Sequence, residues 1–253
     1  MRSSLKTVGL SLALLIVLSA CTASSTIENP NFQDEETASS ETSDTADERE
    51  KEQAQEPATE EAPPTPEQEP LSIVETHFWP SDDFDRWYYV AYIQNPNTDF
   101  GWFSEPFDFE AYDSEGILLD TDFEYASILP DSTGVFHGWW SDVGNNLVTR
   151  MEVRGPSDGS LIDGQVGSIE VESIEYENDR FSTEVSGVLA SNFAEDQESV
   201  KVIIVIRDSE GSIINAEWGY LSRLPAGAKA RFEESIFDFE ITDSMQIEVH
   251  PML

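Results

Sequence analysis

Beyond residue 70, apolar and polar residues alternate over many short segments, which Asn, Asp, Gly and Pro interrupt. A period of two residues is typical of half-buried antiparallel strands. The alternation predicts four sets of side chains that each share one strand face: Trp87, Tyr89, Ala91 and Ile93; Phe107, Phe109 and Ala111; Leu147, Thr149, Met151 and Val153; and Met245, Ile247 and Val249. No sustained 3.6-residue period follows residue 70, so we predict an all-β fold with little helix.

The same part of the chain repeats itself. Residues 90–130 align without a gap with residues 185–225, at an offset of 95, and 11 of the 41 aligned positions are identical. A period of this length is too long for a solenoid and fits one β-sandwich domain. We therefore predict two tandem Ig-like antiparallel β-sandwich domains, at residues 71–157 and 165–253, with the glycine-rich segment 155–167 as their joint.

The tetrapeptide "DSEG" occurs in both copies, at Asp113–Gly116 and Asp208–Gly211. It predicts a tight hairpin turn in which glycine takes a positive φ and the aspartate side chain caps the backbone N–H groups of the turn. A catalytic or metal-binding role for the two aspartates is the less favoured alternative.

A family resemblance appears at Phe109-Glu110-Ala111-Tyr112-Asp113, which is followed by Ser-Glu-Gly. This stretch resembles the F-x-L-Y-D motif of a bacterial extracellular domain family named after it, with Ala111 in place of the usual Leu. The second copy keeps only Asp208 of the motif, although both copies place Leu-Pro before an aromatic strand, in "ILPDSTGVF" and "RLPAGAKARF". The resemblance covers residues 87–136, and 181–232 more weakly. It implies an Ig-like sandwich on a secreted or lipid-anchored protein, and it implies no catalysis.

The N-terminus has the pattern of a bacterial lipoprotein signal. Arg2 and Lys6 precede an apolar stretch of 12 residues, which is too short to span a bilayer comfortably and fits a signal-peptide core. "LSAC", at Leu18–Cys21, then resembles the lipobox. The resemblance implies that diacylglycerol is attached to the Cys21 sulfur and that residues 1–20 are removed. With further acylation, for example by palmitate, such an anchor is stable. The alternative is a plain secretory signal in which Cys21 is incidental.

Residues 21–70 have a different composition, rich in Glu, Thr, Ser and Pro and almost free of aromatic residues. Such a segment cannot bury enough apolar surface to offset the entropy of ordering. We predict a disordered acidic tether that holds the folded part away from the membrane. A short charged helix at "ADEREKEQAQE", before Pro57, is a minor alternative.

The charge of the chain is extreme, with 13 Lys and Arg against 51 Asp and Glu and a formal net charge of −38. This field repels nucleic acid and anionic lipid head groups, so we predict no nucleic-acid partner. Cationic partners, divalent ions and simple solubility in a saline medium remain open. With one cysteine, no intramolecular disulfide is possible.

Motifs that carry chemistry are absent from the sequence. His77, His137 and His250 lie far apart, and no zinc-ligand spacing, phosphate loop or nucleophile elbow is present. We therefore predict a protein that is not an enzyme and that has no cofactor or metal. Acidic clusters at 81–85, 120–124 and 194–198 leave a calcium site as an alternative, although none has the EF-hand pattern.

Aromatic residues are the better indication of a binding site. Trp102 and Phe103 lie in a segment with Gly, Asn and Asp, and Trp139 and Trp140 are adjacent. Neighbours on a strand point to opposite faces, so one of the latter pair should be in the core. We name these four residues as a candidate partner patch, and core packing or docking between the two domains as the favoured alternative.

Together these features predict a lipid-anchored protein on the extracytoplasmic face of the cell membrane, with a non-enzymatic binding or structural role in the envelope. Its partners would be the membrane, through the lipid, and an envelope protein or glycan. Two alternatives stay open: an envelope hydrolase or its accessory subunit, and a solute-capture lipoprotein of a transporter. The lack of alternating strands and helices argues against the two-lobed fold usual for solute capture.

Overall fold

The computed structural model describes residues 67–81, 85–141, 143, 147–162, 164 and 166–253. This part of the chain forms thirteen strands and no helix. Every strand pairing within it is antiparallel, which confirms the all-β prediction. The predicted signal peptide, Cys21 and the tether up to residue 66 lie outside the described residues.

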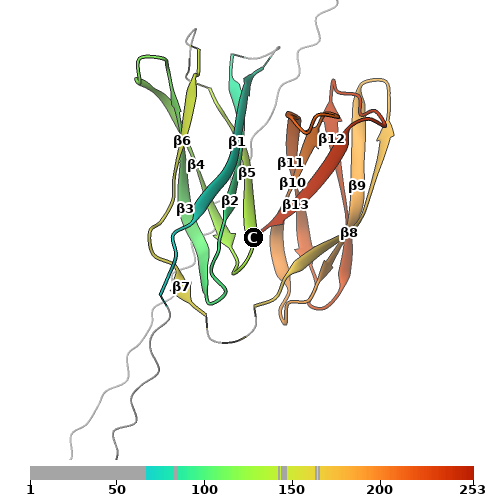
Figure 1. Cartoon of the computed structure of the whole chain (residues 1–253). Coiled ribbons are helices and arrows are strands. Elements are labelled where there is room, and N and C mark those ends of the chain that lie inside the picture. The colour runs from blue at the N-terminus through green and yellow to red at the C-terminus, as the bar shows by residue number, and fades with distance from the viewer. Residues whose placement is uncertain (1–66, 82–84, 142, 144–146, 163, 165) are drawn as a thin grey trace, which may run out of the picture. The chain divides into compact units, whose positions relative to one another are not determined.

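The first seven strands form two sheets, which we call sandwich 1 (Figure 1). One sheet has the order β1-β2-β5, and the other has the order β4-β3-β6, with β7 added to β3. The strands are β1 Ser72–Pro80, β2 Trp87–Gln94, β3 Phe100–Tyr112, β4 Leu118–Ile128, β5 Thr133–Trp140, β6 Arg150–Arg154 and β7 Ser160–Leu161.

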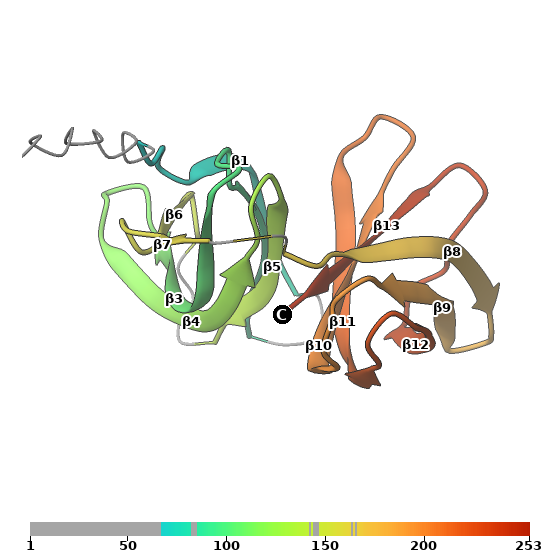
Figure 2. The same cartoon turned by 90° about the horizontal axis from the view of Figure 1, so that it is seen from below.

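The last six strands form two more sheets, which we call sandwich 2 (Figure 2). Their orders, β12-β9-β8 and β11-β10-β13, correspond to β5-β2-β1 and β4-β3-β6, so the sequence repeat is also a repeat of topology. The strands are β8 Ile169–Asn178, β9 Ser182–Ser191, β10 Gln197–Arg207, β11 Ile213–Leu224, β12 Lys229–Phe237 and β13 Gln246–Met252.

The "DSEG" turns have the predicted geometry. Oδ1 of Asp113 accepts hydrogen bonds from the backbone N–H of Glu115 (2.9 Å) and Ile117 (2.8 Å), and Asp208 does the same in the second copy. Gly116 and Gly211 have φ of 79° and 88°, a region that strongly favours glycine. The aspartates therefore cap their own hairpins.

Two other repeated residues have a local structural role. Asn97 Oδ1 accepts a hydrogen bond from the N–H of Glu69, just before β1, and Asn192 Oδ1 accepts one from Ser168, just before β8. Each asparagine thus fixes the segment that leads into its own sandwich. Gln68 is also held, because its side-chain amide donates to the Ser157 carbonyl at 2.8 Å. The last residues that composition assigned to the tether are therefore bonded to sandwich 1.

The core of sandwich 1 is aromatic. The Tyr89 ring packs against Phe109 and Trp140, with centroid distances of 4.8 and 4.7 Å, and Phe136 packs against Phe107 at 4.9 Å. Trp140 Nε1 donates to the Phe109 carbonyl at 2.8 Å, so its polar atom is satisfied inside the core. The predicted inward faces of β2 and β3 are therefore confirmed.

The core of sandwich 2 is largely aliphatic, and it does not include every buried residue of β10. Val202, Ile204 and Ile206 pack with the core of sandwich 2, whereas Ile203 and Val205 join the apolar cluster of sandwich 1. All five are fully buried. The central strand of sheet β11-β10-β13 is consequently covered on both faces, and the apolar cluster of sandwich 1 extends onto the outer face of this sheet.

Candidate functional site

The two sandwiches meet through the outer faces of two sheets. On the side of sandwich 1 the face belongs to β1-β2-β5, because Tyr89 and Trp140 of these strands point inward and Tyr92 and His137 point the other way. On the side of sandwich 2 it belongs to β11-β10-β13, with Ile203 at its centre. This contact positions the polar clusters around Arg207, His137 and Lys201.

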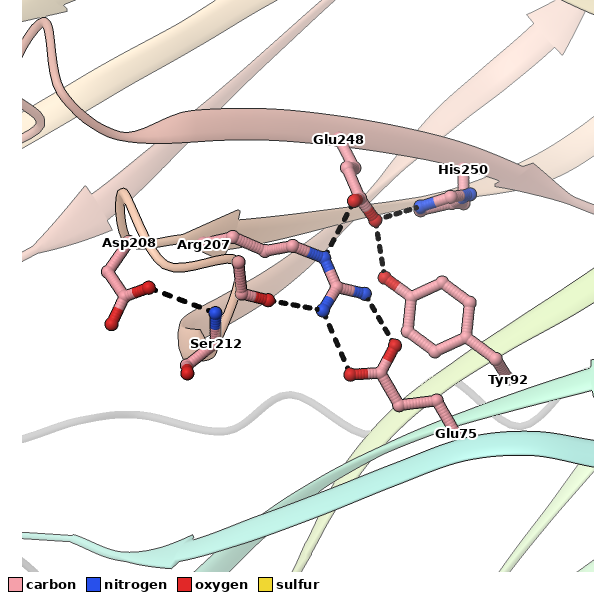
Figure 3. Close-up of polar contacts among 8 residues, drawn as sticks. Glu75, Tyr92, Arg207, Asp208, Ser212, Glu248 and His250 are labelled. Atoms are coloured by element: carbon pink, nitrogen blue, oxygen red, sulfur yellow. Dashed lines mark hydrogen bonds and ion pairs between the residues drawn. The ribbon is translucent and has the colours of Figure 1, made fainter.

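A network of ion pairs centred on Arg207 joins the sandwiches at one edge of this contact (Figure 3). Arg207 Nε donates to Glu248 Oε1 at 2.7 Å, and its two terminal nitrogens donate to the carboxylate of Glu75 at 2.9 and 2.8 Å. Tyr92 donates its hydroxyl to Glu248 at 2.6 Å, and His250 lies 3.2 Å from the same oxygen. Glu75 and Tyr92 come from sandwich 1 and the other three from sandwich 2.

The charges in this network compensate one another, and the pKa values of its members are shifted accordingly. Hydrogen bonding to Arg207 lowers the pKa of Glu75, although partial burial opposes the shift. Burial and the Glu248 carboxylate raise the pKa of Tyr92 far above its usual value. Every charged member has an opposite partner within hydrogen-bond distance, and the guanidinium also donates to the Gly211 carbonyl at 3.0 Å. The arrangement pairs charges across the contact, so that removal of one partner would leave another charge uncompensated.

His137 is buried where the sandwiches meet. Its Nδ1 lies 2.7 Å from the Tyr89 carbonyl oxygen, and its ring stacks on Trp79 with 6.1 Å between centroids. Burial lowers the pKa of His137 to about 4, against the opposing effect of hydrogen bonds to the backbone of Tyr89 and Ala216, and the charge of Lys201 lowers it further. The imidazole is therefore neutral near pH 7.

A groove lies beside this contact, between strands β4 and β5 of sandwich 1 and strands β10 and β11 of sandwich 2. It consists of a hollow of about 470 Å³ and a second of about 220 Å³. The two hollows share Glu124, Lys201 and Tyr220. Aromatic residues line it from both sandwiches: Phe123, Tyr125 and Trp139 from the first, and Trp218 and Tyr220 from the second. The Phe123 and Tyr125 rings lie on the outer face of β4, opposite to the face that carries the side chains of Asp122 and Glu124.

Acidic side chains of β4 hold fixed positions in the groove. Asp122 accepts the Tyr89 hydroxyl at 2.9 Å through Oδ2 and the N–H of Phe123 at 2.9 Å through Oδ1. Asp120 accepts the N–H of Thr121 at 2.8 Å in the same manner. β4 is an edge strand, and an additional strand would pair with the free backbone N–H groups of its edge. The N–H groups of Thr121 and Phe123 already donate to these carboxylates.

The Lys201 ammonium group already lies in the groove. Lys201 Nζ lies 2.6 Å from Glu124 Oε1 and 5.1 Å from the centroid of the Trp218 ring. Both side chains of this ion pair are largely buried. Lys201 belongs to sandwich 2 and Glu124 to sandwich 1, so the ion pair joins the two sandwiches. The ammonium group thus contacts a carboxylate and the face of an aromatic ring.

The four aromatic residues of the candidate patch do not lie together. Trp102 and Trp140 are buried and belong to the core of sandwich 1, so neither contributes to a surface. Phe103 is exposed near Ser104 at the β7 end of β3, and Trp139 is exposed at the end of β5, where it lines the groove. Trp139 and Trp140 do face opposite sides of their strand, as predicted.

Sequence reasoning missed the groove, although the repeat contains one signal of it. Tyr125 and Tyr220 occupy equivalent positions in the repeat, both are more than half exposed, and both line the smaller hollow. The other signal was "VIIVI", Val202–Ile206, which interrupts the period of two. A continuous apolar run of this length is typical of a strand that is buried on both faces.

The acidic clusters that left a calcium site open show no such site among the described residues. Within 67–81, 85–141, 143, 147–162, 164 and 166–253, no three His, Cys, Asp or Glu side chains are grouped so as to hold a metal ion. Asp196, in the third cluster, pairs with Arg223 and accepts the N–H of Ala226. Part of the first cluster lies outside the described residues.

A larger hollow, of about 810 Å³, lies among the loops near the joint of the two copies. Its lining consists of small polar and aliphatic residues such as Thr98, Ser132 and Asn192, and it includes no aromatic ring. In the part of the chain that the structure describes, no helix is long and apolar enough to cross a membrane.

No protein-family model matches the chain, and a search of curated proteins finds no significant match. The resemblances to the lipobox and to the F-x-L-Y-D motif therefore stay predictions. In the structure, Phe109 and Ala111 of the latter motif face the core, and Tyr112 donates its hydroxyl to Glu110 at 2.6 Å.

Proposed function

We propose that this chain is a lipid-anchored protein of the cell envelope that binds a partner, without catalysing a reaction, through a rigid module of two β-sandwiches. The observation that carries the binding function is the double burial of sheet β11-β10-β13. Because Ile203 and Val205 pack into the apolar cluster of sandwich 1, the two walls of the groove between the sandwiches are joined by apolar packing. A surface fixed in advance loses little entropy when it binds.

The arrangement of polar side chains also supports binding rather than catalysis. Arg207, Glu75 and Glu248 neutralise one another across the contact, and Lys201 pairs with Glu124. Catalytic acids and bases usually need an unsatisfied or poised group near a cleft. No specific contact among the described residues favours the hydrolase or the solute-capture alternative.

The attachment of the chain before β1 supports a display role. Gln68 donates to Ser157, the N–H of Gly159 donates back to the Gln68 side chain at 2.9 Å, and Glu69 is bonded to Asn97. A tether whose last residues are hydrogen-bonded to sandwich 1 would connect the folded module firmly to its membrane anchor. In this proposal Cys21 provides the membrane attachment and the acidic segment provides the distance.

The anchoring is tested by Cys21→Ala in the full chain, with Ser24→Ala as the matched control. We expect the control to stay with membranes and the Cys21 variant to lose lipid and to appear in the soluble fraction. A mature N-terminus other than residue 21 in the unaltered protein would refute the lipid anchor.

The binding function is tested by a photoreactive amino acid placed at Phe123, in the groove, or at Phe181, on sandwich 2. These positions are matched, since each phenylalanine is 64% exposed. In intact cells we expect a discrete cross-linked product from position 123 that position 181 does not give. Identical products from the two positions, or none from position 123, would refute a binding function for the groove.

A further inference from the structure

We infer that the groove between the sandwiches binds a basic polypeptide segment, whose arginine or lysine side chains lie against its aromatic rings and beside its carboxylates. This inference rests on the proposed binding function and gives it a ligand class. The occupant is a partner protein that offers an extended, positively charged stretch at the envelope.

Charge complementarity is the first argument. The larger hollow is lined by Asp120, Asp122 and Glu124, and Lys201 is the one lysine or arginine among its lining residues. Three carboxylates against one ammonium give these lining residues a net charge of −2, which the Arg86 guanidinium over the Trp139 ring reduces to −1, and His137 is neutral there. A low-dielectric groove focuses this charge, and the whole chain, at −38, adds to it. An anionic ligand is thereby disfavoured.

Exposed aromatic rings are the second argument. Phe123 and Tyr125 are exposed on the outer face of the edge strand β4, with their rings 6.2 Å apart, and the β4 carboxylates project from the opposite face of the same strand. Trp218 and Tyr220 are neighbours on β11, with their rings 5.4 Å apart. Aromatic faces attract lysine and arginine cations, and the attraction is stronger where water is partly excluded. The rings and the carboxylates therefore favour the same kind of ligand group.

The cations of the chain itself show how such a ligand would lie. Lys201 sits between the Glu124 carboxylate and the Trp218 ring, and the Arg86 guanidinium lies 5.3 Å from the centroid of the Trp139 ring. Tyr125 and Tyr220, in contrast, are held by no cation in the described contacts, and they are the exposed pair that the repeat preserves. In this proposal, the arginine or lysine side chains of the bound segment lie against these two rings.

The edge strands specify how the segment is recognised. On β4, Asp120 and Asp122 occupy the N–H groups of Thr121 and Phe123, and on β11 the N–H of Ala216 donates to Asn215 and that of Trp218 to Glu217. Strand addition needs these donors to be available. The segment is therefore bound through its side chains and not as an additional strand.

The test uses the full chain and a short photoreactive peptide of alternating arginine and serine, at about 0.15 M salt, where long-range attraction is screened. The matched probes are the glutamate–serine peptide and the neutral sugar cellohexaose. The groove variant is Phe123→Ser with Tyr125→Ser, and its control is Phe181→Ser with Phe237→Ser, which removes two equally exposed rings elsewhere on the molecule.

We expect the arginine peptide to bind the groove variant about tenfold more weakly than the control variant, since two exposed cation–π contacts are lost. Cross-links should map to the strands around Tyr125 and Tyr220. A second pair of double variants tests the carboxylates independently of the aromatic rings. Asp120→Asn with Asp122→Asn should also weaken binding of the peptide. Glu115→Gln with Glu210→Gln, at the exposed turns, should not. Denaturation curves verify that each variant is folded.

The opposite results would overturn the inference. Equal affinities for the groove and control variants, cross-links confined to the acidic segment before residue 67, or displacement of the peptide by cellohexaose would each exclude a basic segment as the occupant. If position 123 still cross-links a partner in cells while the arginine peptide fails these tests, the binding function stands and the ligand class is wrong. If position 123 cross-links nothing in cells, the function itself fails.

Discussion

Strands β3 and β10 occupy the same place in the two copies of the repeat, yet their outer faces differ. At an offset of 95, Asp108 and Glu110 of β3 correspond to Ile203 and Val205 of β10. Asp108 is exposed, and Glu110, which is largely covered, forms a salt bridge with Arg154 at 2.9 Å. Ile203 and Val205, in contrast, are fully buried against sandwich 1. The inward faces that the two copies share build each sandwich, and the outer face of sheet β11-β10-β13 packs one sandwich against the other.

The largest effect is expected when the residue of one copy is placed at the equivalent position of the other copy. We expect Ile203→Asp to lower the free energy of unfolding by at least about 4 kcal/mol, because it places a carboxyl group in a closed apolar contact. The reciprocal Asp108→Ile should change it by less than about 1 kcal/mol, because position 108 is exposed. Urea denaturation measures both. Similar effects of the two exchanges would show that the outer face of β10 is not a structural interface.

The fold was largely predictable from the sequence because its determinants are local. The period of two, the "DSEG" turns and the offset of 95 predicted antiparallel strands and two copies, and the structure has them. These signals depend on neighbouring residues and on the geometry of a single hairpin. The Trp139–Trp140 pair was treated correctly for the same reason.

The groove was not predictable because its walls come from residues distant in sequence. Glu124 and Lys201 are 77 positions apart, and Glu75 and Arg207 are 132 apart. Pairing across such separations follows from how the sheets pack, which no local pattern encodes. Trp102 was placed in the candidate patch because glycine and polar residues surround it, but its ring is buried beside Gly159.

The ion network is the polar counterpart of the apolar contact, and only the second copy has an arginine at its centre. Tyr112, the equivalent of Arg207, instead lies under the Arg150 guanidinium within sandwich 1. We expect Arg207→Ala to lower the free energy of unfolding by about 3 kcal/mol or more, because it leaves the Glu75 and Glu248 carboxylates near each other without their cation.

A triple variant, Arg207→Met with Glu75→Gln and Glu248→Gln, should recover most of that stability, since it removes the charges together. Thermal and urea unfolding of both variants provide the measurement. If the triple variant were no more stable than Arg207→Ala, the loss would come from packing around the guanidinium and not from uncompensated charge.

The two copies also differ at the position of His137. His137 is buried in the contact between the sandwiches, whereas its counterpart on β12, Glu233, is exposed. With a pKa of about 4 in the folded protein and an ordinary value of 6.5, the unfolded chain binds the proton first as the pH falls. The contribution of the neutral His137 imidazole to stability is therefore complete above pH 6.5 and is lost between pH 6.5 and 4, by up to about 3 kcal/mol.

His137→Gln should remove this part of the pH dependence while leaving the steeper loss below pH 4.5, where Glu75 and Glu248, whose pKa values are lowered, take up protons. Denaturation series at several pH values compare the two proteins. An unchanged slope between pH 6.5 and 4 in the variant would mean that another group controls stability in that range.

The smallest predicted effect concerns a carboxylate that both copies carry between equivalent strands. In sandwich 1, Asp122 accepts a hydrogen bond from Tyr89, whereas its counterpart in sandwich 2, Glu217, lies near Glu234. Burial raises the pKa of Glu217, and burial together with the charge of Glu217 raises that of Glu234. The folded protein therefore holds these protons more tightly, and it loses stability as the pH rises from about 4.5 through the raised values.

At pH 7 we consequently expect Glu217→Gln to stabilise the protein by roughly 0.5–2 kcal/mol, as removal of a like-charge contact commonly does. The amide oxygen of the glutamine can still accept the Trp218 N–H that Glu217 binds at 3.0 Å. The gain should vanish near pH 4, where the carboxyl groups are protonated in both states. Asp122→Asn should act in the opposite direction, with a loss of about 1 kcal/mol, because the Tyr89 hydroxyl exchanges a charged acceptor for a neutral one. Calorimetric melting at the two pH values distinguishes the cases, and a destabilised Glu217→Gln variant at pH 7 would show that the two copies use this carboxylate alike.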